Sequence, residues 1–335
     1  MNVRKVNTGC EARRYLTELV TSLVLLGFLV SACNVNAPRV VKIGLVAPFE
    51  GRYREVGYDV IPAVRLAIRE WAASTPGSRV VVELVAYDDG GIPEQALEQA
   101  HKLVDDQDVV VVIGHWRDDT TREAAPIYKA GGLTLLTFAT EAVGRSPSVY
   151  SLSPSAGELR LAVERYLSSE SVMADLHLNG DGDVIAESMR LHHIEESSLY
   201  LGGPTWGLSQ FYLLAGSRAE GAQYVTGAIR PEDLSTEAAR ADEFTQKYRE
   251  ANLNIPPGPL APIAYDAARL SLLALDSCLD KTLSRGSVGI ALGQASLEDG
   301  LTGPVAFTET GRRLDAPILL YEWRAGERIL VKRLQ

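Results

Sequence analysis

The sequence has few cysteines and few basic residues, and each shortage excludes a class of protein. Its 335 residues include only three cysteines, Cys10, Cys33 and Cys278, which are too few for a disulfide framework and are not spaced like a zinc site. The net charge is −10 and basic residues occur at most in pairs, so the chain lacks the positive surface that a nucleic-acid partner requires. We therefore expect neither a disulfide scaffold nor nucleic-acid binding.

Catalytic, cofactor and metal motifs are also missing. The chain contains no G-x-S-x-G, H-E-x-x-H, P-loop or G-x-G-x-x-G pattern. Asn179, Asp181 and Asp183 imitate the start of a calcium loop, but the sixth position is Val184 instead of glycine and the twelfth is Arg190 instead of glutamate. We expect a solvated turn there, and we expect no enzyme activity, no cofactor and no metal site.

The longest apolar run is too short for a membrane-spanning helix. It extends from Leu19 to Val30, whereas a span needs about 20 residues. Basic residues precede this run and small residues follow it, which is the order of a secretory signal. Residues 1–32 are therefore predicted to be a signal peptide, and a permanent transmembrane helix is the weaker alternative.

The segment Val30-Ser31-Ala32-Cys33 resembles a bacterial lipobox. That resemblance implies diacylglycerol on the sulfur of Cys33 and acylation of the new amino terminus. Two or more acyl chains give durable anchoring, since each buried methylene contributes ~0.8 kcal/mol. The alternative is an ordinary cleavage site followed by an unmodified thiol. We expect an extracytoplasmic protein that is lipid-anchored to the bacterial cell envelope, with residues 33–39 as a short tether.

The body of the chain alternates apolar runs with helical patterns. The runs 40–48, 79–89, 108–114 and 133–138 are predicted strands, and the segments between them carry apolar residues at helical spacing. Thr120 and Glu123 match a capping box at the start of one of these helices. Strands that alternate with helices of this length predict right-handed βαβ units on a parallel sheet.

A second α/β unit follows the segment Val149-Tyr150-Ser151-Leu152. Ser155 and Glu158 match another capping box, at the start of a helix that reaches about Leu167. The remaining elements are predicted as strands at 198–203 and 222–229, helices near 236–252 and 262–280, and a final hairpin with its turn at Ala325-Gly326. Cys278 lies in an apolar helical stretch, where a buried thiol is the default expectation.

Several blocks, in order along the chain, resemble the type 1 periplasmic binding proteins of the leucine/isoleucine/valine-binding kind. They are KIGLVAPFEGRYREVGYDVIPAVRLAIREW, VELVAYDDGGIPEQALEQAHKLVDDQDVVVVIGHW, LTLLTFATEA, VYSLSPS, PIAYDAARLSLLAL and LTGPVAFTETGRRLDAPILLYEW. The resemblance implies an α/β fold with two lobes, each a parallel sheet flanked by helices, joined by three crossovers. It also implies a small-molecule ligand in the cleft and an ABC permease as partner. Lobe 1 is expected to hold 40–149 plus 259–303, and lobe 2 to hold 150–258 plus 304–335.

The chain departs from the family pattern in its second lobe. Only residues 168–197 are available where the family has further βα units, and one such unit takes about 30 residues. We therefore expect a reduced second lobe with fewer parallel strands than the first. The tyrosines that the family's second lobe presents to the ligand have no counterpart in the sequence. After the later strand the chain reads Gly203-Pro204-Thr205-Trp206 where the family tends to place an acidic residue.

Candidate ligand residues lie in loops after predicted strands, because ligands of open parallel sheets bind beyond the carboxyl ends of the strands. Tyr53 and Trp116 are expected to form walls of the site, and Arg117 and the helix start at Thr120 suit a carboxylate. The alternative for Arg117 is a surface ion pair with Asp118 or Asp119, its neighbours in sequence.

The pair Ala139-Thr140 matches a ligand-contacting Ala-Thr pair of the family, and Thr205 is the candidate from the second lobe. For Thr140 the alternative is a hydroxyl that only caps a turn. The resulting hypothesis is a lipid-anchored solute-binding protein of an ABC importer, with a small amino-acid-like or amide or carboxylate ligand. The main alternative is a ligand-independent regulatory or scaffolding envelope lipoprotein of the same fold, and an unrecognised hydrolase is the third.

Overall fold

The computed structural model describes residues 38–141, 148–171, 174–178, 182–193, 199–234, 238–279 and 283–334. Two β-sheets lie in one compact unit, Val40–Pro76 with Val82–Gln335. The predicted signal peptide and Cys33 lie outside the described residues, as do Asn179 and Asp181 of the imitated calcium loop. Within those residues, no helix combines the length and the apolar character that crossing a membrane requires.

The first sheet has five strands in the order β2-β1-β3-β4-β5. They are β1 (Arg39–Ala47), β2 (Val80–Asp88), β3 (Val109–Gly114), β4 (Thr134–Thr137) and β5 (Val149–Ser151). The pairs β1–β3, β3–β4 and β4–β5 are parallel, as predicted. Every residue of β3 is buried, which explains why its sequence is a continuous apolar run.

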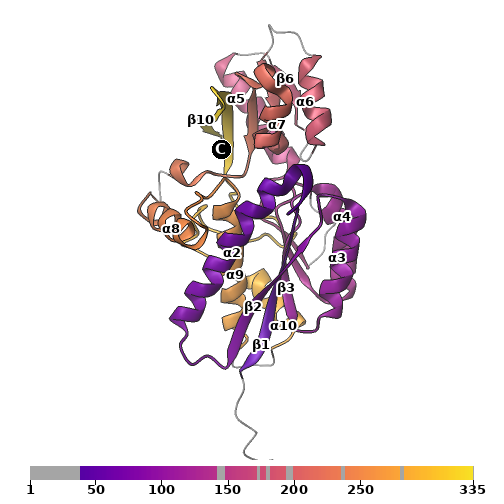
Figure 1. Ribbon diagram of the computed structural model, residues 1–335, viewed down its shortest axis with the longest axis vertical. Coiled ribbons are helices and arrows are strands. Elements are labelled where there is room, and N and C mark those ends of the chain that lie inside the picture. Colours follow the sequence, from indigo (N-terminus) through magenta and orange to yellow (C-terminus); the bar gives the residue numbers. More distant parts are fainter. Residues whose placement is uncertain are drawn as a thin grey trace, which may run out of the picture. The chain divides into compact units, whose positions relative to one another are not determined.

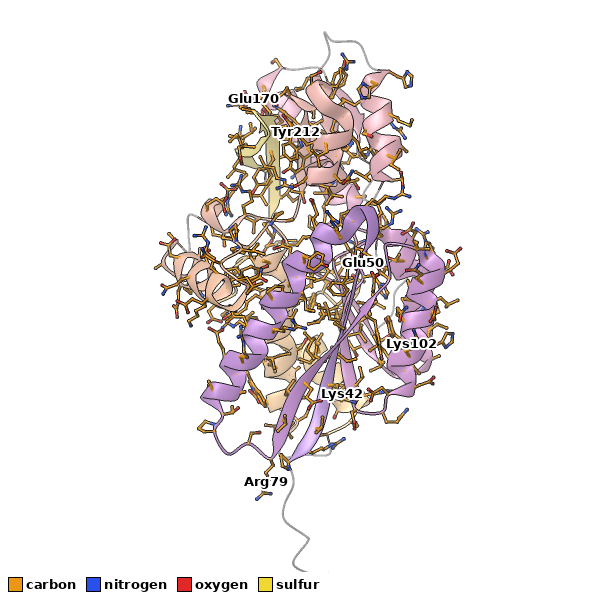
Figure 2. All side chains as sticks on the ribbon, viewed as in Figure 1. Lys42, Glu50, Arg79, Lys102, Glu170 and Tyr212 are labelled. Carbon is orange, nitrogen blue, oxygen red and sulfur yellow. The ribbon has the colours of Figure 1, made fainter. Side chains whose placement is uncertain are left out.

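Helices cover both faces of the first sheet (Figure 1). One face carries α3 (Pro93–Asp105) and α4 (Asp118–Ala130), whose alanines and leucines pack on the strands. The other carries α2 (Arg54–Ser74), α9 (Ala261–Asp276) and α10 (Arg285–Gln294). At the far end of α3, Asp106 forms an ion pair of 2.9 Å with Lys42 of β1, which is labelled in Figure 2.

The second sheet also has five strands, in the order β10-β9-β8-β7-β6. They are β6 (Ala174–His177), β7 (Leu199–Gly202), β8 (Gln223–Thr226), β9 (Ile318–Arg324) and β10 (Glu327–Leu334). The first three run parallel, whereas β8–β9 and β9–β10 are antiparallel pairs. The turn at Ala325-Gly326 is confirmed, and both of its residues have positive φ.

Helices also pack on both faces of the second sheet. α5 (Ala156–Glu170) covers one face and opens with the predicted Ser155–Glu158 capping box, in which each side chain binds the other residue's backbone N–H. The second part also contains α6 (Val184–His192), η2 (Pro204–Gly207), α7 (Ser209–Ala215), η3 (Gly216–Ala219), η4 (Pro231–Asp233) and α8 (Ala238–Ala251). A short helix of the first part, η1 (Gly51–Tyr53), directly precedes α2.

Trp206 fills the core on the face of the second sheet opposite α5. Its indole N–H donates to the buried carboxylate of Glu187 in α6 at 2.8 Å, and its ring stacks on Phe211 with centroids 4.9 Å apart. The neighbouring strand residue is Gly202, because a Cβ at this position would lie 2.0 Å from the indole. The Gly-Pro-Thr-Trp segment is therefore shaped by packing against the sheet.

Two expectations about this architecture need correction. The second sheet is not smaller in strand number, since each sheet has five strands in the described part of the chain. The narrower expectation of fewer parallel strands is confirmed, with three in the second sheet against four mutually parallel strands in the first. The prediction of a capping box at Thr120 and Glu123 is wrong, because α4 begins at Asp118. The Thr120 hydroxyl instead donates to the carbonyl of Arg117 inside the first turn.

Candidate ligand-binding site

A cavity of about 390 Å³ opens at the carboxyl ends of the central strands. One wall comes from the start of α2 and from the loops after β3 and β4, and another from η2, the start of α7 and the segment after β8. The loop that precedes α9 supplies a third wall. The side chains used below, all of which line this cavity, are Glu55, Tyr58, Asp59, Trp116, Asp118, Phe138, Thr140, Tyr224, Tyr248 and Arg328.

Two of the seven predicted ligand residues line this cavity. Trp116 and Thr140 are among its lining residues, whereas Tyr53, Arg117 and Thr205 are not. Thr120 and Ala139 are also buried away from it. The structure thus brings the predicted loops to one place, but it turns most of the predicted side chains into the protein.

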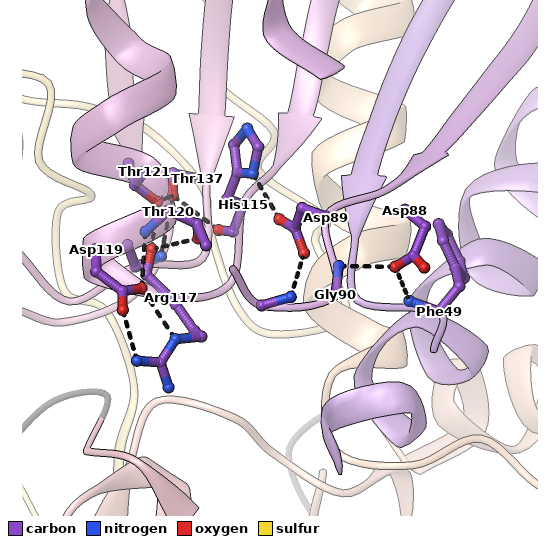
Figure 3. A network of polar contacts seen from close by, with 12 residues as sticks. Phe49, Asp88, Asp89, Gly90, His115, Arg117, Asp119, Thr120, Thr121 and Thr137 are labelled. Atoms are coloured by element: carbon purple, nitrogen blue, oxygen red, sulfur yellow. Dashed lines mark hydrogen bonds and ion pairs between the residues drawn. The ribbon is translucent and has the colours of Figure 1, made fainter. Parts of the chain in front are cut away.

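Arg117 is bound by protein partners (Figure 3). Its Nε and Nη2 donate to the two carboxylate oxygens of Asp119 at 2.9 and 2.6 Å, and its Nη1 donates to the hydroxyl of Tyr53 at 2.8 Å. Only 10% of the side chain is exposed. The ion pair with Asp119, the alternative to ligand contact, is therefore the arrangement in the structure.

Tyr53 joins the loop before α2 to the start of α6. Its hydroxyl donates to Asp183 at 3.2 Å and accepts from the backbone N–H of Val184 at 3.3 Å. Arg52 adds an ion pair with Asp183 at 2.6 Å. The ring of Tyr53 lies 5.5 Å from that of Trp116, so Tyr53 supports a cavity wall from behind. Burial raises the pKa of the Tyr53 hydroxyl above its usual value.

Three further predicted ligand residues, Thr120, Ala139 and Thr205, are buried in the protein and do not line the cavity. Thr120 is fully buried in the first turn of α4. The N–H of Ala139 donates to the hydroxyl of Thr137 at 3.1 Å, which fixes the loop after β4. Thr205 is fully buried in η2, and its hydroxyl has no hydrogen-bond partner within the described residues.

A carboxylate of the protein occupies the polar corner of the cavity at the end of β4. Asp118 accepts hydrogen bonds from the backbone N–H groups of Thr140 and Glu141 at 2.8 and 2.9 Å. The hydroxyl of Thr140 donates to the second oxygen of the same carboxylate at 3.0 Å. Asp118 is only 5% exposed and lines the cavity. The N–H and O–H donors of this corner are therefore bound to a side chain of the chain itself.

Asp59 of α2 holds the loop that precedes α9. Its carboxylate accepts from the N–H groups of Gly258, Leu260 and Ala261 at 2.6, 2.7 and 3.1 Å, at the start of that helix. Such donors favour the charged form, but burial has the larger effect and raises the pKa of Asp59 to about 7. Tyr248 of α8 donates its hydroxyl to the backbone carbonyl of Asp59 at 3.0 Å.

Glu55 and Arg328 connect α2 with the second sheet. Glu55 accepts from the N–H of Ser209 at 2.8 Å, and Arg328 lies 3.5 Å from the same carboxylate. Arg328 also donates to the carbonyl of Gly207 at 2.6 Å and lies over the ring of Trp323, 4.9 Å from its centroid. These bonds fix the rim of the cavity.

Tyr224 is a cavity residue that the sequence comparison missed. It projects from β8, is 3% exposed and stacks on Tyr321 with centroids 5.5 Å apart. Its ring end lies against Gly207, where a Cβ would come within 2.6 Å of the ring. Its hydroxyl makes no hydrogen bond with the described residues. The second sheet thus does present a tyrosine to the cavity, and the signal available in the sequence was a tyrosine in the predicted strand 222–229, three residues before Gly227.

A fully buried polar cluster surrounds His115, which directly precedes the cavity residue Trp116. His115 Nδ1 is 2.6 Å from Asp89, as Figure 3 shows. Its Nε2 is 3.1 Å from the hydroxyl of Tyr128, and all three residues are fully buried. Burial raises the pKa of Tyr128 well above its usual value. Across the residues that the structure describes, no group of three or more His, Cys, Asp or Glu could hold a metal ion.

Sequence relatives match the first part of the chain. A family model described as periplasmic binding protein matches residues 40–172. The leucine-, isoleucine-, valine-, threonine- and alanine-binding protein of Pseudomonas aeruginosa is 30% identical over 122 residues, 36% of this chain and 32% of that protein. The Leu/Ile/Val-binding protein of Escherichia coli K12 is 28% identical over 109 residues, 32% of this chain and 29% of that protein. The matched segment spans about a third of the length of these curated relatives.

Solved structures match almost the whole described chain. The branched-chain amino acid transporter substrate-binding protein LivJ of Streptococcus pneumoniae, in complex with isoleucine, aligns with a TM-score of 0.72 at 16% identity, over 88% of this chain and 100% of that one. A solute-binding protein of an ABC transporter from R. palustris, in complex with benzoate, aligns with a TM-score of 0.66 at 17% identity, over 88% and 96%. The chain therefore has the type 1 periplasmic binding protein fold, and its residues 40–172 match the periplasmic binding protein family in sequence.

Proposed function

We propose that this chain is the extracytoplasmic solute-binding component of an ABC importer, and not an enzyme. The observation that carries the proposal is the cavity of about 390 Å³ at the carboxyl ends of the strands, with walls from both sheets. A site of this size suits one small molecule, and its lining is mostly apolar with a few polar groups. The names of the relatives agree with solute binding, and those of the solved structures also name a transporter, an ABC transporter in one case. An ABC permease is therefore the partner that we propose.

Within this proposal, Trp116 and Thr140 contact the ligand together with Asp118 and Tyr224. The first lobe comprises 40–149 plus 259–303 and the second 150–258 plus 304–335, so the ligand lies between them. The matched relatives bind branched-chain amino acids by name, and the structural relative from R. palustris holds benzoate. Ligands of this size, with an apolar body, are the class that the cavity favours. Lipid on Cys33 would keep the protein at the membrane near its permease.

A ligand-independent regulatory role is the second candidate, and one observation favours it. Direct polar contacts join the loops of the first sheet to those of the second, including Tyr53 with Asp183 and Glu55 with Ser209. Bonds of the protein itself thus join the two sets of loops. A scaffolding lipoprotein of this fold would depend on such bonds, whereas a transport receptor gains closure energy from its solute.

Native mass spectrometry of the full-length protein purified from its host in detergent separates the two roles. A solute receptor is expected to retain a small molecule at one equivalent, and the Trp116→Ala variant is expected to lose it because a cavity wall is removed. Circular dichroism of the variant controls for folding. A wild-type protein that carries no small molecule, and that shows no thermal shift with a broad metabolite set, would contradict the proposal and favour the regulatory role.

A further inference from the structure

The polar corner at the end of β4 has the donors of an anion site, but the protein's own carboxylate occupies it. Two backbone N–H groups and one hydroxyl, from Thr140 and Glu141, all bind Asp118. Backbone N–H groups that converge in this way are the usual partners of a bound carboxylate. A ligand carboxylate at this corner would have to displace the Asp118 carboxylate from these donors. Otherwise it would lie beside Asp118, and the two negative charges would repel each other.

The other charges of the cavity act in the same direction. Among the described lining residues, the acidic side chains Glu55, Asp59 and Asp118 face one basic side chain, Arg328. Arg328 is already bound by Glu55, by a backbone carbonyl and by the hydroxyl of Ser209. Glu55 is paired with Arg328, and burial raises the pKa of Asp59 to about 7, so Asp59 is partly protonated near neutral pH. Asp118 is therefore the main negative charge of the cavity, and the one cation among the described lining residues is engaged within the rim.

The remaining walls supply groups that attract a cation with an apolar body. Aromatic rings from Tyr58, Trp116, Phe138 and Tyr248 line the cavity. The faces of such rings attract ammonium groups, by about 0.5 to 2 kcal/mol for each well-placed contact. Tyr224, which is only 3% exposed, also lines the cavity. Its hydroxyl is a polar group of the cavity wall that a bound molecule can contact.

We propose that the cavity selects small amines with an apolar body and no free carboxylate, and that Asp118 determines this selectivity. This proposal rests on the proposed solute-binding function. The negative charge of Asp118 attracts the ammonium group and repels a carboxylate. The aromatic walls bind the apolar body, and Tyr224 offers its hydroxyl to the polar end.

Titration calorimetry with three probes of the same apolar skeleton tests this selectivity. The probes are 3-methylbutylamine, which has only the amine, 4-methylpentanoate, which has only the carboxylate, and leucine, which has both. The full-length protein in detergent is expected to bind the amine at least about tenfold more tightly than leucine or the acid, since one charge-assisted contact corresponds to about 10 to 100 fold.

Two substitutions at Asp118 give opposite expectations for opposite charges. Asp118→Asn keeps an oxygen for the N–H donors but removes the charge, so affinity for 3-methylbutylamine is expected to fall by about 10 to 100 fold. Asp118→Ser releases the N–H groups of Thr140 and Glu141 and the Thr140 hydroxyl, so leucine or 4-methylpentanoate is expected to gain at least about tenfold. A gain of binding cannot result from misfolding.

Glu123→Gln is the matched control. It removes one negative charge from the exposed face of α4, and Glu123 neither lines the cavity nor belongs to the corner around Asp118. Its affinities for all three probes are expected to stay within about threefold of wild type.

The outcomes separate this inference from the function on which it rests. If wild type binds leucine or the acid more tightly than the amine, or if the Asp118 variants leave the preference unchanged, the selectivity is wrong while solute binding stands. If neither wild type nor either Asp118 variant binds any probe, and the purified protein holds no small molecule, both proposals fail.

Discussion

The guanidinium of Arg117 is bound on both sides by the protein, which leads to a prediction about a single residue. Arg117→Ala removes two bonds to Asp119 and one to Tyr53, so the free energy of unfolding is expected to fall by about 2 to 3 kcal/mol. Affinity for 3-methylbutylamine should change less than about threefold, because Arg117 does not line the cavity. Urea denaturation and calorimetry measure the two quantities.

Arg122→Ala, on the exposed face of the same helix, is the control for Arg117 and should leave both quantities nearly unchanged. A tenfold or larger loss of affinity in Arg117→Ala without loss of stability would instead assign Arg117 to the ligand.

Asp59 gives a pH dependence whose sign follows from burial. Its pKa is about 7 in the folded protein, above the ordinary value of 3.8. Between these values the folded state holds a proton that the unfolded state has released, so the free energy of unfolding falls as pH rises from about 4 to 7. The slope from this group is at most about 1.4 kcal/mol per pH unit. Urea denaturation across this range measures it.

Asp59→Asn is neutral at every pH and should flatten that slope, whatever its effect on the baseline stability. Asp105→Asn, at the exposed end of α3, should retain the wild-type slope. An Asp59→Asn variant with the wild-type slope would show that Asp59 does not titrate in this range.

At the scale of helices and strands, the sequence was informative where one local pattern decides the structure. Continuous apolar runs predicted β1, β3 and β4, and the Ser155–Glu158 box predicted the start of α5. The similar Thr120–Glu123 pattern failed because α4 begins two residues earlier, which places Thr120 inside the first turn. The equal strand number of the sheets was missed because the short segment before β7 still provides β6.

The contribution of the Ser155–Glu158 capping box to the stability of α5 can be tested by substitution. Ser155→Ala removes the acceptor for the N–H of Glu158, so the free energy of unfolding is expected to fall by about 1 kcal/mol. Ser155→Thr keeps a hydroxyl and should retain most of that stability. Hydrogen exchange at the first turn of α5 should quicken in the alanine variant alone. Equal exchange in all three proteins would show that the box does not limit fraying of this helix.

At the scale of the whole molecule, the fold could be predicted far better than the site. An α/β fold depends on many apolar positions. The sequence segments that predicted this fold are spread along the chain, so the prediction did not depend on any single residue. The site depends on which polar side chains the protein binds for itself. Asp119 binds Arg117, Asp183 binds Tyr53, and Asp118 binds the donors of Thr140. Each pairing depends on the three-dimensional approach of groups, two of them from distant segments, and no spacing rule specifies it.

Membrane attachment is the last property to test, and it concerns the chain as a unit. If Cys33 carries acyl chains, they contribute ~0.8 kcal/mol per buried methylene, and two or more chains hold the protein durably. Cys33→Ser should therefore leave the folded body unchanged but release it from membranes, or leave an unprocessed precursor of lower mobility. Cys278→Ser is the matched control, because Cys278 is buried just after α9 and its thiol does not lie at the surface of the folded body. Fractionation and gel mobility decide between them: a Cys33→Ser protein that stays with the membranes at the wild-type mobility would rule out lipid on this sulfur.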